Sequence, residues 1–425
     1  IVIMISPNRL LTVLDAVNPQ LNTITINVLQ SKKEVNMETI YFDHISGTTI
    51  HPEVKKTMIN YINEHYGNPV SQHQLGDAAS AALEAARQQV ARLINAQPGE
   101  IVFTSGGTES VNHAIKGVAM ATHDKGKHII TSNIEHQSVS KSLRMLMRMG
   151  YRVTSLSVDK YGVVNPKDVE RAITKETVLV TIMHANNEIG TLEPIAEIGK
   201  ITREKGVIFH TDAIASVGVI PFDVDEMGAD LVSMAANQFY GPSGVGALYI
   251  RPKTRILPII EGGMQENGQR AGSENMVGII GMGKAAELAK SEMPERIKHL
   301  SQLRQAWIER LTTIEAIDIN GHPTNCLPHL VSFSVNFVEG ESMILMLDEK
   351  GICASTRSAC ASGSLRASHV LIATGCDYAA AQGTLIFSFG ITNTMEELDK
   401  AIAVLKDSVV FLRNMSPLYK KRAAS

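Results

Sequence analysis

Short apolar runs with strand character alternate with helical patterns through most of the chain. Seven β-rich runs fall between residues 100 and 251, and each is followed by residues with helical apolar spacing. Strands of this kind, joined by helices, are typical of a parallel sheet that is buried on both faces. The pattern therefore predicts an α/β fold with a mostly parallel seven-stranded sheet covered by helices.

A second region follows the last of these runs. An amphipathic helix is predicted over residues 295–314, and another over 394–415 closes the chain. Three apolar segments between them are interpreted as strands, namely residues 330–337, 342–352 and 383–390. We therefore expect a smaller α/β domain beside the large one.

The domain boundaries follow from this division. The large domain is expected over residues 48–296, and the small domain over 37–47 together with 297–425. Residues 1–36 hold only short apolar pieces, none near the roughly 20 residues that span a bilayer, and they lack the basic start and cleavage site of a signal peptide. Because Met37 directly precedes the first strand, this segment is interpreted either as an extension, disordered or mis-started, or as a short structured arm.

Composition narrows the class of protein. Of the 425 residues, 44% are hydrophobic and 20% are charged, which is the balance of a soluble globular protein. A net charge of -3 offers no basic excess for phosphates, which argues against nucleic acid or an acidic membrane as the main partner. Four cysteines in so long a chain form no disulfide framework, so a reducing, cytoplasmic location is expected.

A glycine-rich turn stands between a predicted strand and a predicted helix in "VFTSGGTESVNHAIKG", residues 102–117. The backbone N–H groups of Gly107 and Thr108 at the helix start would form an anion site, aided by the Thr108 hydroxyl. The same sequence also suits an ordinary strand-to-helix turn, so the motif alone does not decide between the two.

Polar residues follow three other predicted strands. His136 comes after one strand, and Asn187 and Asp212 stand at the carboxyl ends of two more. Open α/β sheets bind ligands at that edge. A buried aspartate needs a partner, and a protonated ring nitrogen would be a good one. A lone histidine is also often structural or exposed, so the evidence for a site is that the three polar residues are expected at the same edge of the sheet.

The order of these motifs closely resembles that of the cysteine desulfurases, which belong to the class V aminotransferase-like group of fold-type I PLP enzymes. The resemblance covers residues 38–412 and rests on a set of ordered pieces, "FDHISGTTIHPEV", "GNPVSQH", "FTSGGTES", "EHQSV", "NNEIG", "HTDA", "YGPSGVGALYIR", "GGMQENGQRAGSEN" and "RSACASGS".

The resemblance implies a role for each motif residue around the cofactor. Gly107 and Thr108 would hold the phosphate and His136 would stack on the pyridine ring. Asn187 would approach the ring hydroxyl, and Asp212 would hold the protonated ring nitrogen. All of these roles are implied by the family and not by spacing.

Two further positions carry implications for partners. The hydroxyl of Ser273 would reach the phosphate in the partner subunit, which implies a homodimer. Cys360 matches the nucleophilic cysteine that takes sulfur from the substrate as a persulfide, and Arg357 nearby would lower the pKa of its thiol. Cys360 could also be one ligand of an iron–sulfur cluster shared with another protein, or an inert surface thiol.

Cys326 and Cys376 lack metal-site spacing, so the chain encodes no metal site by itself.

The positions that depart from the family pattern are those expected to contact the cofactor or the substrate. The cofactor lysine is replaced by Gln238, and the preceding histidine, a phosphate contact, by Asn237. A serine is replaced by Ala235, a glutamine by Ala215, and the arginine that clamps the substrate carboxylate by Ile386. The amide of a glutamine is neither a nucleophile nor a base, and an aliphatic side chain cannot replace a bidentate arginine.

We therefore expect a divergent desulfurase-like protein of iron–sulfur or sulfur-transfer metabolism without classical PLP-dependent desulfuration. In this interpretation PLP binds noncovalently at most, and Cys360 accepts persulfide sulfur or completes a cluster site with an iron–sulfur scaffold or sulfur acceptor. One alternative is an active desulfurase, or another C–S lyase or aminotransferase, that holds PLP noncovalently. Another is a catalytically dead structural or regulatory subunit.

Overall fold

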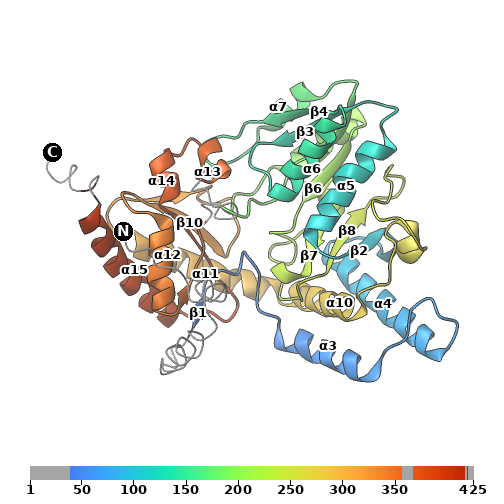
Figure 1. Ribbon diagram of the computed structural model, residues 1–425, viewed down its shortest axis with the longest axis horizontal. Helices are drawn as coiled ribbons and strands as arrows, with labels where there is room; N and C mark the ends of the chain where they lie inside the picture. Colours follow the sequence, from blue (N-terminus) through green and yellow to red (C-terminus); the bar gives the residue numbers. More distant parts are fainter. Residues whose placement is uncertain (1–38, 357–366, 417–418, 420–425) are drawn as a thin grey trace, which may run out of the picture. The chain divides into compact units, whose positions relative to one another are not determined.

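A seven-stranded sheet forms the centre of the larger part of the fold (Figure 1). A computed structural model of the protein describes residues 39–356, 367–416 and 419, and residues 40–425 group as one unit by their contacts. The strand order is β2-β8-β7-β6-β5-β3-β4, and only β8 runs antiparallel to its neighbours. The strands are β2 (Ile101–Thr104), β3 (His128–Ser132), β4 (Arg152–Leu156), β5 (Thr177–Thr181), β6 (Ile208–Asp212), β7 (Leu231–Ala235) and β8 (Gly246–Ile250). The predicted α/β class and mostly parallel sheet are confirmed.

Neighbouring residues of each central strand enter different cores, because side chains alternate across a sheet. Ile129 and Leu179 belong to a core with the helices of one face, whereas Ile130 and Val180 belong to a core with the helices of the other face. Near-continuous apolar strands are the result. The helices of the first face are α5 (Gly107–Ala121) and α6 (Gln137–Arg148), and those of the second include α4 (Gln74–Leu93), α7 (Pro166–Ala172), α8 (Ile195–Lys205) and α10 (Met276–Ser291).

Smaller sheets are formed by the ends of the described chain. β12 (Thr384–Ser388), β10 (Leu330–Val335) and β9 (Ile317–Asn320) make an antiparallel sheet in that order, and β1 (Ile40–Tyr41) pairs with β11 (Ile352–Cys353). The fully buried Trp307 stacks on Phe387 with ring centroids 4.6 Å apart, at the centre of a separate core. The helices here are α11 (Met293–Leu311), α12 (Gly340–Glu349), α13 (His369–Ala373), α14 (Tyr378–Gln382) and α15 (Met395–Met415).

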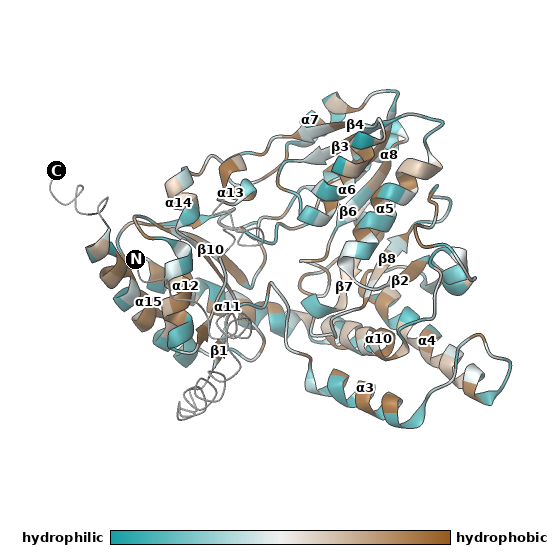
Figure 2. Cartoon of the chain, in the orientation of Figure 1, coloured by the Kyte–Doolittle hydropathy of each residue, from teal (hydrophilic) through white to brown (hydrophobic). Residues whose placement is uncertain are grey.

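One predicted strand is wrong, because residues 342–352 are mostly helical. The chain forms α12 up to Glu349 and only then the two-residue strand β11. Met343 and Leu347 are buried four residues apart while Leu345 is exposed, which is the periodicity of a helix face. Figure 2 shows the mixture of hydrophobic and hydrophilic residues along the helices of this part, including the long α15.

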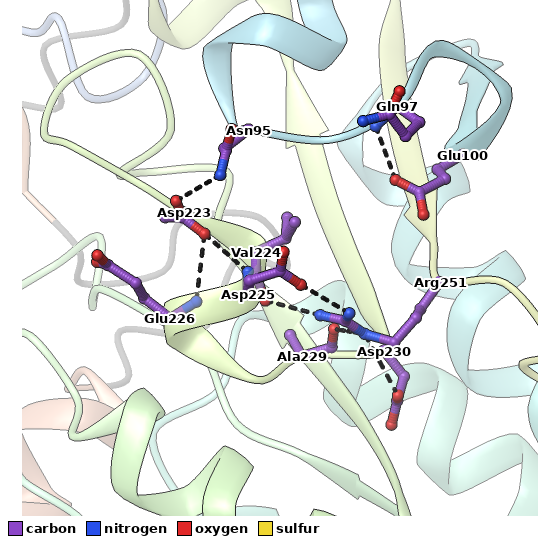
Figure 3. Close-up of polar contacts among 10 residues, drawn as sticks. All are labelled: Asn95, Gln97, Glu100, Asp223, Val224, Asp225, Glu226, Ala229, Asp230 and Arg251. Atoms are coloured by element: carbon purple, nitrogen blue, oxygen red, sulfur yellow. Dashed lines mark hydrogen bonds and ion pairs between the residues drawn. The ribbon is translucent and has the colours of Figure 1, made fainter.

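A polar network ties the end of β8 to the short helix α9 (Val224–Met227), as Figure 3 shows. Arg251 donates to a carboxylate oxygen of Asp225 at 2.8 Å and to the backbone oxygen of Val224 at 2.8 Å. The Asp223 side chain caps α9 by accepting from the backbone N–H of Asp225 at 2.8 Å. The loop between β6 and β7 is thereby held against the neighbouring strand β8.

Some sequence predictions stay predictions. The division into a large domain over 48–296 and a small domain over 37–47 and 297–425 stays a prediction. The predicted extension over 1–36 lies outside the described residues, as do Arg357 and Cys360. In the part of the chain that the structure describes, no helix combines the length and apolar character needed to cross a membrane.

Candidate functional site

A cavity of about 370 Å³ opens beside the carboxyl ends of the parallel strands. Strand β6 ends at Asp212 and β7 at Ala235, and both residues line the cavity. This is the edge at which open α/β sheets bind ligands. The complete lining is Ile45, Ser46, Gly107, Thr108, His136, Met183, Ala185, Asn187, Asp212, Ile214, Ala215, Ala235, Asn237 and Gln238.

The structure brings seven of the sequence-predicted site residues to this cavity. They are Gly107, Thr108, His136, Asn187, Asp212, Asn237 and Gln238. Ser273 is exposed, between the one-turn helix η3 (Gln265–Gly268) and α10, and does not line the cavity. Cys360 lies outside the described residues, so its placement relative to the cavity stays a prediction.

Asp212 is the charged centre of the cavity wall. Its side chain is 5% exposed and accepts a hydrogen bond from the backbone N–H of Ile214 at 3.0 Å. Burial raises the pKa of Asp212 to about 6, and the Ile214 hydrogen bond opposes that rise. Among the described residues no lysine, arginine or histidine forms an ion pair with Asp212. This carboxylate is therefore available to a ligand that brings its own donor.

Two helix starts contribute the residues on other sides of the cavity. His136 is the N-cap of α6, where its Nδ1 accepts from the backbone N–H of Ser138 at 3.1 Å. Gly107 and Thr108 begin α5 after Gly106, whose φ of 148° suits glycine. The first N–H groups of a helix lack partners within it, so this end could donate hydrogen bonds into the cavity.

Gln238, expected from the sequence at the position of a cofactor lysine, makes a structural hydrogen bond. Its side chain is 9% exposed, and its amide nitrogen donates to the backbone oxygen of Ile45 at 3.0 Å. Next to it, the backbone oxygen of Asn237 accepts from both the N–H of Thr48 at 2.8 Å and the hydroxyl of Thr48 at 3.0 Å. These contacts fasten the segment after β1 to the turn after β7.

Ile386 and Ala215, two other positions that the sequence predicts to depart from the family, share an apolar cluster. Ile386 on β12 is 1% exposed and packs in a cluster with Ile45, Ala215 and Leu330. Ile386 does not itself line the cavity, whereas Ile45 and Ala215 do. Apolar side chains thus pack behind this wall, where the sequence comparison predicts the loss of an arginine.

Sequence reasoning missed the apolar lining and two buried acids beside the site. Ile45, Met183 and Ile214 line the cavity, but apolar residues carry no chemical signal in a sequence. Glu135 and Glu193 are 2% and 4% exposed, and burial raises the pKa of each to about 8. Glutamates are almost never fully buried without partners. The signal for Glu135 was its place beside His136, directly after a buried strand.

The fold, with a cavity at the carboxyl ends of the parallel strands, is that of the fold-type I PLP enzymes. Residues 40–401 match the family described as Aminotransferase class-V. A curated cysteine desulfurase IscS of Dictyoglomus turgidum is 49% identical over 383 residues, covering 90% of this chain and 97% of that protein. A second, from Methanosarcina thermophila, is 47% identical over 384 residues and covers 90% and 95% respectively.

Solved structures agree with these relatives. A NifS-like protein superposes with a TM-score of 0.83 at 36% identity, covering 88% of this chain and all of the other. A NifS-like protein from Rickettsia africae gives a TM-score of 0.80 at 28% identity, covering 87% of this chain and 99% of that one. The chain belongs to the class V aminotransferase family, among relatives named cysteine desulfurases. The predicted resemblance is thereby confirmed.

The family is PLP-dependent, so the lining residues can be compared with what that cofactor needs. A covalent link to the protein requires a lysine amine, and no lysine lines the cavity in the described part of the chain. The Gln238 side chain, which does line the cavity, donates from its amide to the backbone oxygen of Ile45. The lining residues therefore do not fit covalently bound PLP.

Metal binding at this site has no support from side chains that the structure describes. Within the described residues, no cluster of three or more His, Cys, Asp or Glu side chains could hold a metal ion. Cys326, Cys353 and Cys376 are each free and partly buried. The predicted cluster ligand Cys360 is outside that set and stays a prediction.

Proposed function

We propose that this protein acts in sulfur transfer without carrying out PLP-dependent removal of sulfur from cysteine. The observation that supports the proposal is Gln238, buried at the cavity wall with its amide donating to the Ile45 oxygen at 3.0 Å. A lysine supplies both an anchor and a proton carrier in the family reaction, and proton transfer by a positioned group contributes roughly 10²–10⁴-fold in rate. Gln238 supplies neither.

In this proposal the working group is the thiol of Cys360. Its thiolate would attack the outer sulfur of a persulfide on a donor protein, forming a new S–S bond as the old one breaks and the donor thiolate leaves. The electrons and atoms balance without another reactant. The same thiol could instead complete a cluster site with an iron–sulfur scaffold, and the two uses share the requirement for Cys360.

Two measurements test the proposal on the full chain. Purified protein with added PLP and L-cysteine is expected to release no alanine or sulfide above a protein-free blank. Incubation with a persulfidated donor protein is expected to add one sulfur atom to the chain, detected by intact mass. Cys360→Ala should abolish that addition, whereas Cys326→Ala, at a partly buried thiol, should not. Alanine release, or sulfur uptake that survives Cys360→Ala, would contradict the proposal.

A second candidate function is an active C–S lyase or desulfurase that holds PLP noncovalently. It is favoured by the retention of His136, Asn187 and Asp212 at the cavity, the residues that face the cofactor in the family. Alanine release that depends on added PLP and is lost in Asp212→Asn would establish this candidate. A chain that is indifferent to both assays would instead be a structural or regulatory subunit.

The proposed assembly is a homodimer. Ser273 is exposed outside its own cavity, which suits a residue expected to reach the site of a partner subunit. Sedimentation equilibrium is expected to give twice the chain mass of 46.1 kDa. A monomer at all concentrations would refute this part of the proposal.

A further inference from the structure

We propose that a groove lined by methionines, formed by α5, α6 and the segment after β8, binds a partner protein through the apolar face of an amphipathic helix with acidic flanks. The inference goes beyond the proposed function, because it concerns a surface that shares no lining residue with the cavity and does not involve Cys360. It rests on the exposed thioethers of the groove, on its fixed walls and on the basic side chains around it.

Two adjoining hollows make up this groove. One has a volume of about 510 Å³ and the other of about 310 Å³, and Met120, Pro258 and Glu261 line both. The helices α5 and α6 that form one side of it pack on the same face of the large sheet (Figure 1). The apolar side chains of the methionine groove are Met120, Met145, Met149, Pro258, Ile259 and Met264.

The groove exposes large apolar side chains. Met145 is 48% exposed, Met149 52% and Met264 80%, and Leu257 beside them is 47% exposed. Contiguous apolar surface of this kind marks an interaction site, whereas single scattered residues do not. The flexible, polarizable thioether of methionine adapts to different apolar partners, and an amphipathic helix lays its apolar face into such grooves. The methionine groove therefore suits one side of a helix, whose apolar anchors recur every three or four residues.

The walls of the groove are fixed by hydrogen bonds to α5. The backbone N–H of Leu257 donates to the backbone oxygen of Gly117 at 3.1 Å. The hydroxyl of Tyr151, which follows α6, donates to the backbone oxygen of Ala119 at 2.6 Å. A preformed surface lowers the entropic cost of binding. Because the surface is hollowed, it receives an inserted helix, whereas contact with a bilayer needs apolar residues that project from the protein.

Basic side chains stand beside the groove on α6. Lys141, Arg144 and Arg148 are exposed on the same side of this helix as its two groove methionines, because all five positions follow the i, i+3, i+4, i+7, i+8 spacing of one face. The helix contains no acidic residue, and none of these three cations is in an ion pair with a residue that the structure describes. Glu261 is the one carboxylate among the described lining residues. Acidic flanks on the partner are the complementary charge.

The same charges argue against a second copy of this chain in the groove. A symmetric pair of copies that met at this patch would place Arg144 and Arg148 of one copy against the same residues of the other. Like charges that face each other across an interface cost free energy. We therefore expect the proposed homodimer, which involves Ser273, to leave the methionine groove open.

Fluorescence anisotropy with matched peptides tests the inference on the full chain. The probe is a labelled peptide of about 16 residues made of leucine, alanine and glutamate, with its leucines on one helix face. One comparison peptide has lysine in place of each glutamate, and the other has the composition of the probe in scrambled order. The probe is expected to bind with a Kd of about 1–10 μM, and both comparison peptides at least about tenfold more weakly.

Variants of α6 separate the groove from the rest of the surface. Met145→Gln/Met149→Gln keeps side chains of similar length and helix propensity, and it should weaken binding of the probe about tenfold because two apolar contacts are lost. Met147→Gln is the matched control, since Met147 is 55% exposed on the same helix but does not line the groove. Binding should change less than about twofold in this control. Arg144→Gln/Arg148→Gln should weaken binding at low salt and reduce its dependence on salt concentration.

Hydrogen exchange of the native chain gives a second measurement that needs no variant. The bound probe should protect residues 144–149 and 257–264. Absence of binding, equal binding of the glutamate and lysine peptides, or equal effects of Met145→Gln/Met149→Gln and Met147→Gln would overturn the inference.

Two other occupants of the groove would also overturn it. Loss of the dimer in Met145→Gln/Met149→Gln, seen by sedimentation equilibrium, would assign the groove to a second copy. Binding to vesicles of phosphatidylserine and phosphatidylcholine that is lost in the same variant would assign it to a membrane surface. None of these results bears on sulfur uptake by Cys360.

Discussion

Glu135 makes the stability of this protein depend on pH in a way that one substitution should remove. The Glu135 carboxylate accepts from the Ser132 hydroxyl at 2.7 Å and from the backbone N–H of Met183 at 3.0 Å, both through Oε1. Its Oε2 is buried without a partner in the described structure. Burial raises the pKa of Glu135 to about 8, with Asp212 and Glu193 adding to the rise. Glu135→Gln keeps the accepting oxygen and cannot ionise.

The sign and the size follow from proton linkage. The unfolded chain ionises Glu135 near pKa 4.5, whereas the folded chain keeps it protonated up to about 8. Between these values the folded state binds more protons, so the free energy of unfolding falls as the pH rises. The slope is about 1.4 kcal/mol per pH unit for one such group. From about pH 5 to about pH 7 the native protein should lose roughly 2–3 kcal/mol relative to Glu135→Gln.

Urea unfolding followed by far-UV circular dichroism measures this difference at each pH. Comparing the variant with the native chain cancels the other titrating groups, including the histidines whose pKa is lowered by burial, His44, His113, His128, His184, His210 and His329. Glu204→Gln, at an exposed position, should show no such trend. A difference between Glu135→Gln and the native chain that stays constant within about 0.5 kcal/mol across this range would refute the reasoning.

Three further predictions follow from contacts of the described chain. Glu266→Ala should lower the free energy of unfolding by about 3 kcal/mol in urea titrations, because the buried Arg87 loses a bidentate partner at 2.7 and 2.9 Å and keeps only Glu84 as a carboxylate partner, and the backbone N–H of Phe103 loses its acceptor. Trp307→Ala should cost about 3–5 kcal/mol in the same assay, since the ring is fully buried. Gln238→Lys alone should not yield alanine from cysteine in the presence of PLP, because Ile386 offers no clamp for the substrate carboxylate; turnover would contradict this.

Much of the fold could be predicted because both strand and helix signals are local. The strands of the large sheet are apolar runs, since helices cover both faces, and Asp212 could be placed at a carboxyl end from the run before it. The strand predicted over residues 342–352 was wrong because the apolar residues there fit both the spacing of a strand and that of a helix. In the structure Met343 and Leu347 are buried on one face of a helix. Tertiary packing, which a local pattern does not contain, settled that segment.

The candidate site also has features that could be predicted from the sequence and features that could not. Polar residues that follow strands, such as Asn187 and Asp212, could be assigned to one edge because the topology of a parallel sheet gathers them. The packing of Ile214 on Gly107 could not, because the two residues are far apart in the chain and neither has a polar side chain. Yet this contact bears directly on whether the turn can still receive a phosphate.

The residues predicted to depart from the family, Gln238, Ala215 and Ile386, are physically linked through Ile45. Ile45 contacts the site twice, since its backbone oxygen accepts from Gln238 and its side chain packs with Ala215 and Ile386. A charged arginine at 386 would face this apolar cluster, and a lysine at 238 would exchange a neutral donor to Ile45 for a buried ammonium group. Each present residue is therefore better tolerated when the others are also present. Gln238, Ala215, Ile386 and Ile45 therefore support one another in this wall, and Asp212 is the one carboxylate among the described lining residues.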